Sequence, residues 1–210
     1  MRKKQLIIFD MDGTLINSGN VISNTINFVR TNIGLEVMEK DELLLNINNP
    51  DINSAEFFYG TSAFTDEQTE LFTQYYDENC VNDIILYDGI KKMLEEVSQH
   101  FTLSIATNAS VEFARKMINH LEIDSHFDMV VGANCVDKPK PHPDMLLKTM
   151  DNLNYCDYDT ILVGDSLKDT QAATKANIDS ILVNWGFSTH SENIAISNSV
   201  ELTKKLLEFK

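Results

Sequence analysis

Two aspartates, Asp10 and Asp12, directly follow a short apolar segment at residues 5–9. Carboxylates at this spacing just beyond a strand can both face one crevice, and ligands of parallel sheets bind in the crevice at the carboxyl ends of the strands. Gly13 follows them and allows the backbone to turn sharply. The pair could serve a ligand site, although aspartates in a turn can also do no more than accept hydrogen bonds from backbone N–H groups.

A second pair of acids, Asp165 and Asp169, follows the apolar segment at residues 160–163. Together with Asp10 they make a cluster of carboxylates that would repel one another if no cation lay among them. An Mg²⁺ ion prefers hard oxygen ligands and would remove this repulsion, so the acids predict a magnesium site. The alternative is that Asp165 or Ser166 only caps the N-terminus of a helix.

A hydroxyl that could bind an anion stands at the end of another apolar segment, residues 101–106. Thr107 lies at the tip of this predicted strand, and the N–H groups after it, beginning at Asn108, can point outward at an anion. The same Thr-Asn sequence is also common in ordinary turns that follow strands.

Lysines in a proline-rich stretch, residues 137–144, could neutralise such an anion. Three prolines at alternate positions predict an extended, pre-ordered backbone, on which a lysine loses little further entropy when it binds a phosphate. Both Lys138 and Lys140 precede a Pro-x-Pro pattern. The alternative is a stiff connector whose lysines are only solvated.

Five short apolar segments rich in β-branched residues predict the strands that position these groups. They span residues 5–9, 101–106, 129–131, 160–163 and 180–183. From residue 88 onward these segments alternate with helical repeats, such as Ile90, Met93, Leu94 and Val97. The alternation predicts an α/β fold with a parallel sheet and helices on both faces.

Residues 17–83 contain no strand-like segment of this quality. Residues 20–32 and 38–46 have helical patterns, with a turn cluster at residues 48–51 after the second. Thr65-Asp66-Glu67-Gln68 resembles a capping box that should open a further helix. The pattern predicts a helical insertion between the first strand and the rest of the sheet.

The amino-acid composition argues against several classes of binding partner. The 210 residues include 17 basic and 32 acidic side chains, a net charge of −15, which repels nucleic-acid phosphates and anionic lipid heads. Three widely spaced cysteines make neither a disulfide framework nor a zinc motif. No segment approaches the roughly 20 apolar residues of a membrane helix. We therefore expect a soluble cytoplasmic protein, a monomer or homodimer, with no nucleic-acid or membrane partner.

Taken in order, the four chemical motifs resemble those of the haloacid dehalogenase-like (HAD) hydrolase superfamily. They are Asp10-x-Asp12-Gly-Thr, Thr107-Asn108, Lys140-Pro-x-Pro and Gly-Asp165-Ser-x-x-Asp169. The helical insertion resembles the cap domain of that family. The resemblance implies a Rossmann-like core made of residues 1–16 and 85–210, and an all-helical cap at residues 17–84. Trp185-Gly186-Phe187 resembles a turn of the phosphoglycolate phosphatase-like subgroup.

The resemblance also implies a role for each acid. Asp10 resembles the nucleophile that forms an aspartyl-phosphate, and Asp12 resembles the general acid and base. Asp10, the Asp12 backbone carbonyl and Asp165 resemble the ligands of Mg²⁺. Asp169 resembles a residue that supports the metal through water or through another ligand.

Three further residues resemble the phosphate-binding groups of the family. The Thr107 hydroxyl and the Asn108 N–H would bind phosphoryl oxygens, and Lys140 would neutralise charge on the nucleophile and the transferring group. We choose Lys140 over Lys138 because Pro143-Asp144 and the predicted helix follow it at the usual distance.

These roles imply a Mg²⁺-dependent phosphomonoester hydrolase acting on a small phosphorylated metabolite, most simply one like phosphoglycolate. A sugar phosphomutase of the β-phosphoglucomutase type, a pyrophosphatase or a nucleotidase of the same superfamily remain alternatives. A non-enzymatic phosphate-binding regulatory module is a further one.

The predicted cap has an uneven charge, with two basic and twelve acidic residues in residues 17–84. Such a cap would bind a polyanionic leaving group poorly, unless the acids only cover the solvated faces of its helices. The aromatic residues at positions 57–59 and 75–76 could line a pocket or form the core of the cap.

Overall fold

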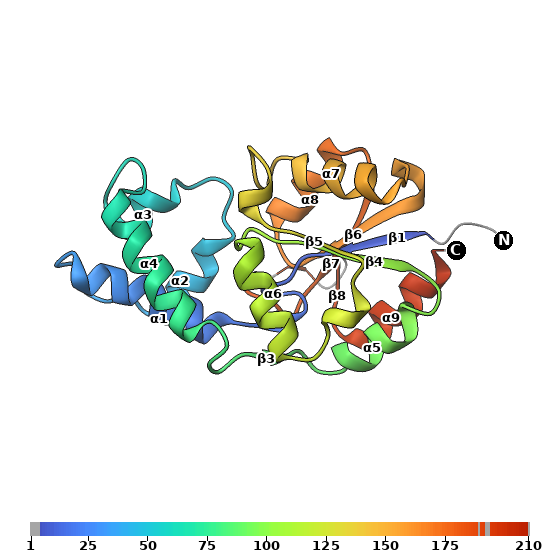
Figure 1. The fold of residues 1–210 in the computed structure, drawn as a ribbon, viewed down its shortest axis with the longest axis horizontal. Helices are drawn as coiled ribbons and strands as arrows, with labels where there is room; N and C mark the ends of the chain where they lie inside the picture. The colour runs from blue at the N-terminus through green and yellow to red at the C-terminus, as the bar shows by residue number, and fades with distance from the viewer. Residues whose placement is uncertain (1–4, 189, 192–193, 210) are drawn as a thin grey trace.

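A parallel sheet forms the centre of the fold. A computed structural model describes residues 5–188, 190–191 and 194–209 of the chain. Within them, six parallel strands lie in the order β5-β4-β1-β6-β7-β8 (Figure 1). The strands are β1 Leu6–Phe9, β4 Thr102–Ala106, β5 Met129–Val131, β6 Thr160–Gly164, β7 Asp179–Val183 and β8 Ala195–Ile196. This sheet confirms the predicted α/β fold and adds the short strand β8.

The two faces of the sheet bury alternate residues of each strand. On β1, Ile7 and Phe9 belong to one apolar core, whereas Leu6 and Ile8 belong to another. The first core packs against α5 Ile90–Val97, α6 Val111–His120 and α9 Ser199–Glu208, and the second against α7 Asp144–Leu153 and α8 Leu167–Lys175. Figure 1 shows these two sets of helices on opposite sides of the sheet. Burial on both faces explains why the strands read as continuous apolar segments.

Local sequence signals explain where several helices begin. In α5, the predicted repeat Ile90, Met93, Leu94 and Val97 is completely or almost completely buried. Helix α6 begins after Ser110, whose hydroxyl oxygen accepts a hydrogen bond from the Phe113 N–H at 3.4 Å.

Short 3₁₀ turns precede or follow strands at η1 Asp124–His126, η2 Ala133–Cys135 and η3 Asp157–Asp159.

Four helices form the insertion after the first strand, at the left of Figure 1. They are α1 Gly19–Asn32, α2 Lys40–Ile47, α3 Ser54–Tyr59 and α4 Asp66–Asn79. The predicted capping box opens α4, because Thr65 and Gln68 exchange the expected side-chain to backbone hydrogen bonds. Helix α3 was not predicted, since its six residues are too few to show a clear helical repeat.

The chain enters and leaves this insertion through one short antiparallel pair. Strands β2 Ile16–Asn17 and β3 Ile85–Leu86 pair with each other, Ile16 opposite Leu86 and Asn17 opposite Ile85. The two connections therefore lie side by side.

Among the described residues, no helix has the length and apolar character needed to cross a membrane.

Candidate active site

The strand order brings the predicted motifs to one edge of the sheet. Strand β1 lies between β4 and β6, in register with both, so their carboxyl ends meet. Asp10 follows β1, Thr107 follows β4 and Asp165 follows β6. The chain runs from β1 to β4 and β5 on one side, and then crosses to β6 on the other. Such a change of direction is where open α/β sheets form ligand crevices.

Lys140 reaches this edge from the loop before α7. Its Nζ lies 2.6 Å from Asp10 Oδ1 and 2.7 Å from Asp169 Oδ1, and the residue is only 4% exposed. Lys138 is exposed two residues earlier in the same loop. Of the two candidate lysines, the structure thus brings Lys140 to the acids.

The prediction of an extended backbone around Lys140 is wrong. The chain makes a tight turn there, closed by a hydrogen bond from the His142 N–H to the Pro139 carbonyl at 3.0 Å. The Asn108 side-chain amide also donates to the Lys140 carbonyl at 2.9 Å. Contacts with distant residues fix this turn, so the alternating prolines alone did not reveal it.

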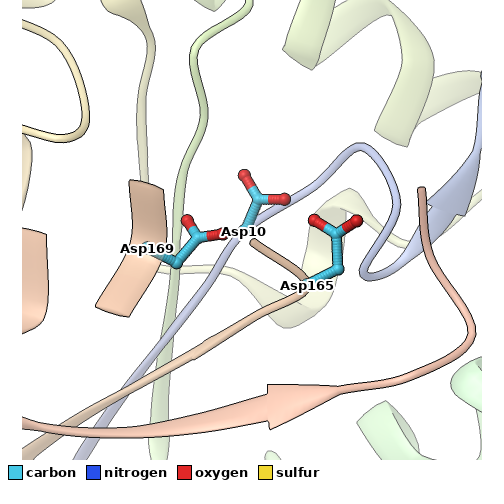
Figure 2. A group of neighbouring side chains, drawn as sticks. All are labelled: Asp10, Asp165 and Asp169. Atoms are coloured by element: carbon cyan, nitrogen blue, oxygen red, sulfur yellow. The ribbon is translucent and has the colours of Figure 1, made fainter. Parts of the chain in front are cut away.

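Three buried carboxylates cluster at this edge of the sheet, and two of them, Asp10 and Asp169, contact the Lys140 ammonium. Asp10, Asp165 and Asp169 each offer one oxygen, and these oxygens all lie within 4.8 Å of one another. Figure 2 shows the three side chains, with Asp10 drawn between the other two. Burial raises the pKa of Asp10 to about 7, although Lys140 opposes the shift. Burial also raises the pKa of Asp165, and the Asp10 charge adds to the effect. Clustered acids of this kind are hard oxygen donors that fit a divalent cation.

The backbone approaches the Asp165 carboxylate closely at two glycines. The Phe187 N–H donates to Asp165 Oδ2 at 2.8 Å, and Asp165 forms no ion pair among the described residues. A Cβ atom on Gly13 would lie 2.5 Å from Asp165 Oδ2, and one on Gly186 would lie 2.4 Å from it. Both glycines are therefore needed for the close approach of backbone to this carboxylate.

Asp169 has a different set of partners from Asp165. Its Oδ2 accepts hydrogen bonds from the Ser166 hydroxyl and N–H, which makes a capping box at the start of α8. Its Oδ1 accepts from Lys140. The helix-capping alternative is thus correct for Ser166, and the same cap aims Asp169 at the lysine.

Asp12 follows Asp10 by two residues and is partly exposed. Its Oδ1 accepts a hydrogen bond from the Ser18 hydroxyl, which stabilises the ionised form, whereas burial raises its pKa more strongly. The Thr14 hydroxyl similarly donates to Asp10 Oδ2 at 3.2 Å. Thr14 belongs to the first motif, but sequence reasoning assigned a contact neither to it nor to Ser18, although both lie within six residues of the acids they contact.

A cavity of about 600 Å³ opens from these groups toward the inserted helices. Asp10, Asp12, Thr107, Asn108 and Lys140 line it from the sheet side. Its other walls come mainly from α1, α3, α4 and α6, through residues that include Ile22, Phe58, Tyr59, Phe72, Tyr76 and Phe113. The aromatic residues Phe58, Tyr59 and Tyr76 are both part of the apolar core and part of the cavity wall.

Two polar side chains join the inserted helices to the sheet edge. The Asn48 amide, at the end of α2, lies 3.4 Å from both carboxylate oxygens of Asp165. Lys168, in the first turn of α8, donates to the Ile47 carbonyl at 2.9 Å. Sequence reasoning missed both residues, because their partners lie more than 100 positions away.

The fold and site together define an α/β enzyme with an acidic centre at the ends of parallel strands. A family model described as "Haloacid dehalogenase-like hydrolase" matches residues 7–183. The chain therefore belongs to the haloacid dehalogenase-like hydrolase family.

Known relatives extend this match along nearly the whole chain. A phosphoglycolate phosphatase from Colwellia psychrerythraea is 26% identical over 198 residues, covering 90% of this chain and 88% of the relative. Another phosphoglycolate phosphatase, from Aquifex aeolicus, is 29% identical over 184 residues, covering 87% and 86%. The crystal structure of a predicted phosphatase from Clostridium acetobutylicum superimposes with a TM-score of 0.86 at 25% identity, covering 98% of this chain and 99% of that one.

Proposed function

We propose that this chain is a Mg²⁺-dependent phosphatase that hydrolyses a small phosphomonoester through a phosphoryl group carried on Asp10. The observation that carries the proposal is the buried ion pair between Lys140 and Asp10 within a cluster of acids. It is supported by the phosphoglycolate phosphatases among the relatives. Phosphoglycolate is for that reason the first compound to test, and the setting is the cytoplasm, consistent with three free cysteines.

In the first step, a carboxylate oxygen of Asp10 attacks phosphorus and the P–O bond to the leaving group breaks. Asp12 gives its proton to the departing alkoxide, and its raised pKa favours the protonated form needed for this transfer. Lys140 and the Thr107 hydroxyl offset the negative charge that gathers on the phosphoryl oxygens.

In the second step, water attacks the phosphorus of the aspartyl-phosphate and releases inorganic phosphate, which restores the Asp10 carboxylate. Asp12, now ionised, takes a proton from that water. Ser18 donates a hydrogen bond to Asp12 and so stabilises this ionised form. One side chain thus acts as acid in the first step and as base in the second.

The carboxylates of Asp10 and Asp165, with the Asp12 backbone carbonyl, would hold the Mg²⁺ ion. When bound, the ion keeps Asp10 ionised and neutralises phosphoryl charge. Asp169 serves the site through Lys140, which its carboxylate holds in place.

Residues 17–84 act in this proposal as a cap domain over a core of residues 1–16 and 85–210. The paired strands β2 and β3 support these boundaries, since both connections cross at one place. The cap would exclude water from the phosphoryl group during the first step.

Steady-state hydrolysis of a panel of phosphomonoesters, with and without Mg²⁺, tests the proposal. We expect Mg²⁺-dependent release of phosphate, which Asp10→Asn abolishes while the variant stays folded. Turnover that survives Asp10→Asn would contradict it. A phosphomutase would instead require a bisphosphate and release little phosphate, and a binding module would bind phosphate without turnover.

A further inference from the structure

Aromatic side chains form a large part of the wall of the active-site cavity. On α4, the Phe72 and Tyr76 rings stack with centroids 5.4 Å apart, and Phe113 of α6 meets Tyr76 edge-on at 5.0 Å. Tyr59 of α3 meets Phe64 at 5.9 Å. All five residues line the same cavity as Asp10 and Lys140.

The cap contributes no charged side chain to this cavity among the described residues. Neither of its two cations lines the cavity: Arg30 donates to the carbonyls of Glu36 and Phe58, and Lys40 Nζ lies 2.6 Å from Asn20 Oδ1. All twelve cap acids are exposed and none lines the cavity, so they cover solvated helix faces. The charge of the cap therefore does not select the leaving group.

The core side of the cavity offers little more positive charge. Within the described residues, Lys140 and Lys168 are its only cationic lining residues. Lys140 is paired with Asp10 and Asp169, and Lys168 donates to the Ile47 carbonyl. A carboxylate or a second phosphate on the leaving group would have to compete for ammonium groups that already have partners, and would otherwise be desolvated without a counter-ion.

The exposure of Phe64 indicates that the aromatic wall has a role besides packing the interior of the cap. Its side chain is 55% exposed, whereas Phe58 and Tyr76 are 4% and 3% exposed. Core packing accounts for the buried rings, but it does not account for an exposed phenyl group at a cavity wall. The exposed Phe64 ring continues the cavity wall through Tyr59, whose ring centroid lies 5.9 Å away, and an apolar patch at a binding groove is typical of a surface that a ligand covers.

We propose that the preferred substrate is a phosphomonoester of an apolar alcohol that carries an aromatic ring. This inference rests on the proposed phosphatase function and specifies its substrate class. The phosphoryl group lies at Asp10 and Lys140, and the ring packs among Phe64, Phe72 and Tyr76. The cavity of about 600 Å³ has room for such a group, because cavities of roughly 300–1,000 Å³ commonly enclose ligands of drug size.

Three phosphomonoesters test the inference: 2-phenylethyl phosphate, ethyl phosphate and phosphoglycolate, each with Mg²⁺ at one pH. The first two release alcohols of similar acidity, so their ratio of kcat/KM reports contacts with the ring and not leaving-group reactivity. We expect 2-phenylethyl phosphate to exceed both others at least tenfold in kcat/KM, about 1.4 kcal/mol. A preference for phosphoglycolate, or equal values for the two alkyl esters, would overturn the inference while leaving the phosphatase function intact.

A substitution of Phe64 tests whether the aromatic wall of the cavity causes the preference for 2-phenylethyl phosphate. Phe64→Ala removes apolar area without opening the buried core, and should lower kcat/KM for 2-phenylethyl phosphate roughly fivefold. The same variant should leave ethyl phosphate within about twofold. Tyr158→Ala, which removes an aromatic side chain that is 76% exposed outside the cavity, is the matched control and should change neither value. Equal losses on both esters would overturn the role of Phe64.

A binding measurement separates this inference from the proposed reaction. Calorimetry with the non-hydrolysable analogues 3-phenylpropylphosphonate and 3-phosphonopropionate, in which a CH₂ group replaces the ester oxygen, compares the ring with the carboxylate in the absence of chemistry. We expect the phenyl analogue to bind at least tenfold more tightly. If no phosphomonoester is hydrolysed, the proposed function fails, and the order of these two affinities still decides the substrate class.

Discussion

The Nζ of Lys140 lies 2.6 Å from Oδ1 of Asp10, and both residues are buried at the end of the central strand. The two are 130 positions apart in the sequence. The same ammonium also contacts Asp169, so one cation holds two carboxylates in place. A buried charge without a partner lowers the stability of the folded state. The contribution of each of these groups can therefore be measured by substituting its partner.

Lys140→Met should abolish most activity and also destabilise the protein. The substitution leaves Asp10 and Asp169 buried without their counter-ion, which costs about 3–5 kcal/mol for a buried pair. Lys138→Met is the matched control, because this lysine is exposed in the same loop. Urea unfolding without Mg²⁺, together with kcat, measures both effects. A larger loss from Lys138→Met would show that the wrong lysine has been chosen.

Asp165→Asn and Asp169→Asn should fail in different ways. Asp165→Asn removes a proposed metal ligand and should weaken Mg²⁺ binding by at least tenfold. Asp169→Asn removes the charge that pairs with Lys140 and so weakens the positioning of the lysine. We expect kcat to fall by about 10- to 100-fold while the Mg²⁺ affinity stays within threefold. Titration of Mg²⁺ against activity and by calorimetry measures the two quantities. Equal loss of Mg²⁺ affinity in both variants would contradict the separate roles.

Gly186→Ala should weaken Mg²⁺ binding although it replaces none of the proposed ligands. The new Cβ would lie 2.3 Å from the Gly13 carbonyl oxygen and 2.4 Å from Asp165 Oδ2, so the carboxylate has to move. Gly34→Ala is the control, since Gly34 has a φ of +79° but nothing within 4 Å of an added Cβ. It should cost about 1–2 kcal/mol of stability from backbone strain and leave the Mg²⁺ affinity unchanged.

The metal-free protein should lose stability as the pH rises from about 5 to 8. Burial raises the pKa of Asp10 in the folded state to about 7, above its ordinary value of 3.8, so in this range the folded state binds more protons than the unfolded state. Stability then falls with pH, by at most roughly 1.4 kcal/mol per pH unit for one such group. Thermal unfolding in EDTA measures the slope.

Addition of Mg²⁺ should remove most of this loss at pH 8, because a ligand that binds only the folded state stabilises it. Asp10→Asn should make the slope in EDTA shallower, since it removes one of the buried acids whose pKa is raised. A stability that rises between pH 5 and 8 in EDTA would contradict the direction of the Asp10 pKa shift.

Much of the core was predictable because strands buried on both faces leave a plain sequence signal. The segments at residues 5–9, 129–131 and 160–163 appear as strands within one residue of the predicted bounds. The order of motifs at strand ends was then sufficient to identify the family, which the match over residues 7–183 confirms.

The parts that sequence reasoning missed depend on contacts between distant segments. The turn at Lys140 is held by Asn108 and by carboxylates on other loops, so the local prolines were misleading. Asn48 and Lys168 join the inserted helices to the sheet edge, and neither belongs to a recognisable pattern. The short paired strands β2 and β3 have only two residues each, which is too few for a periodic signal.

The most direct test of the whole account is to look for a phosphoryl group on Asp10. Enzyme turning over a phosphomonoester with Mg²⁺ is quenched in acid, digested and analysed by mass spectrometry. We predict a phosphorylated peptide whose modified residue is Asp10, and its absence when Asp12→Asn or EDTA blocks the first step. A phosphoryl group on another residue, or steady hydrolysis with no phosphorylated Asp10 under rapid quenching, would contradict the account.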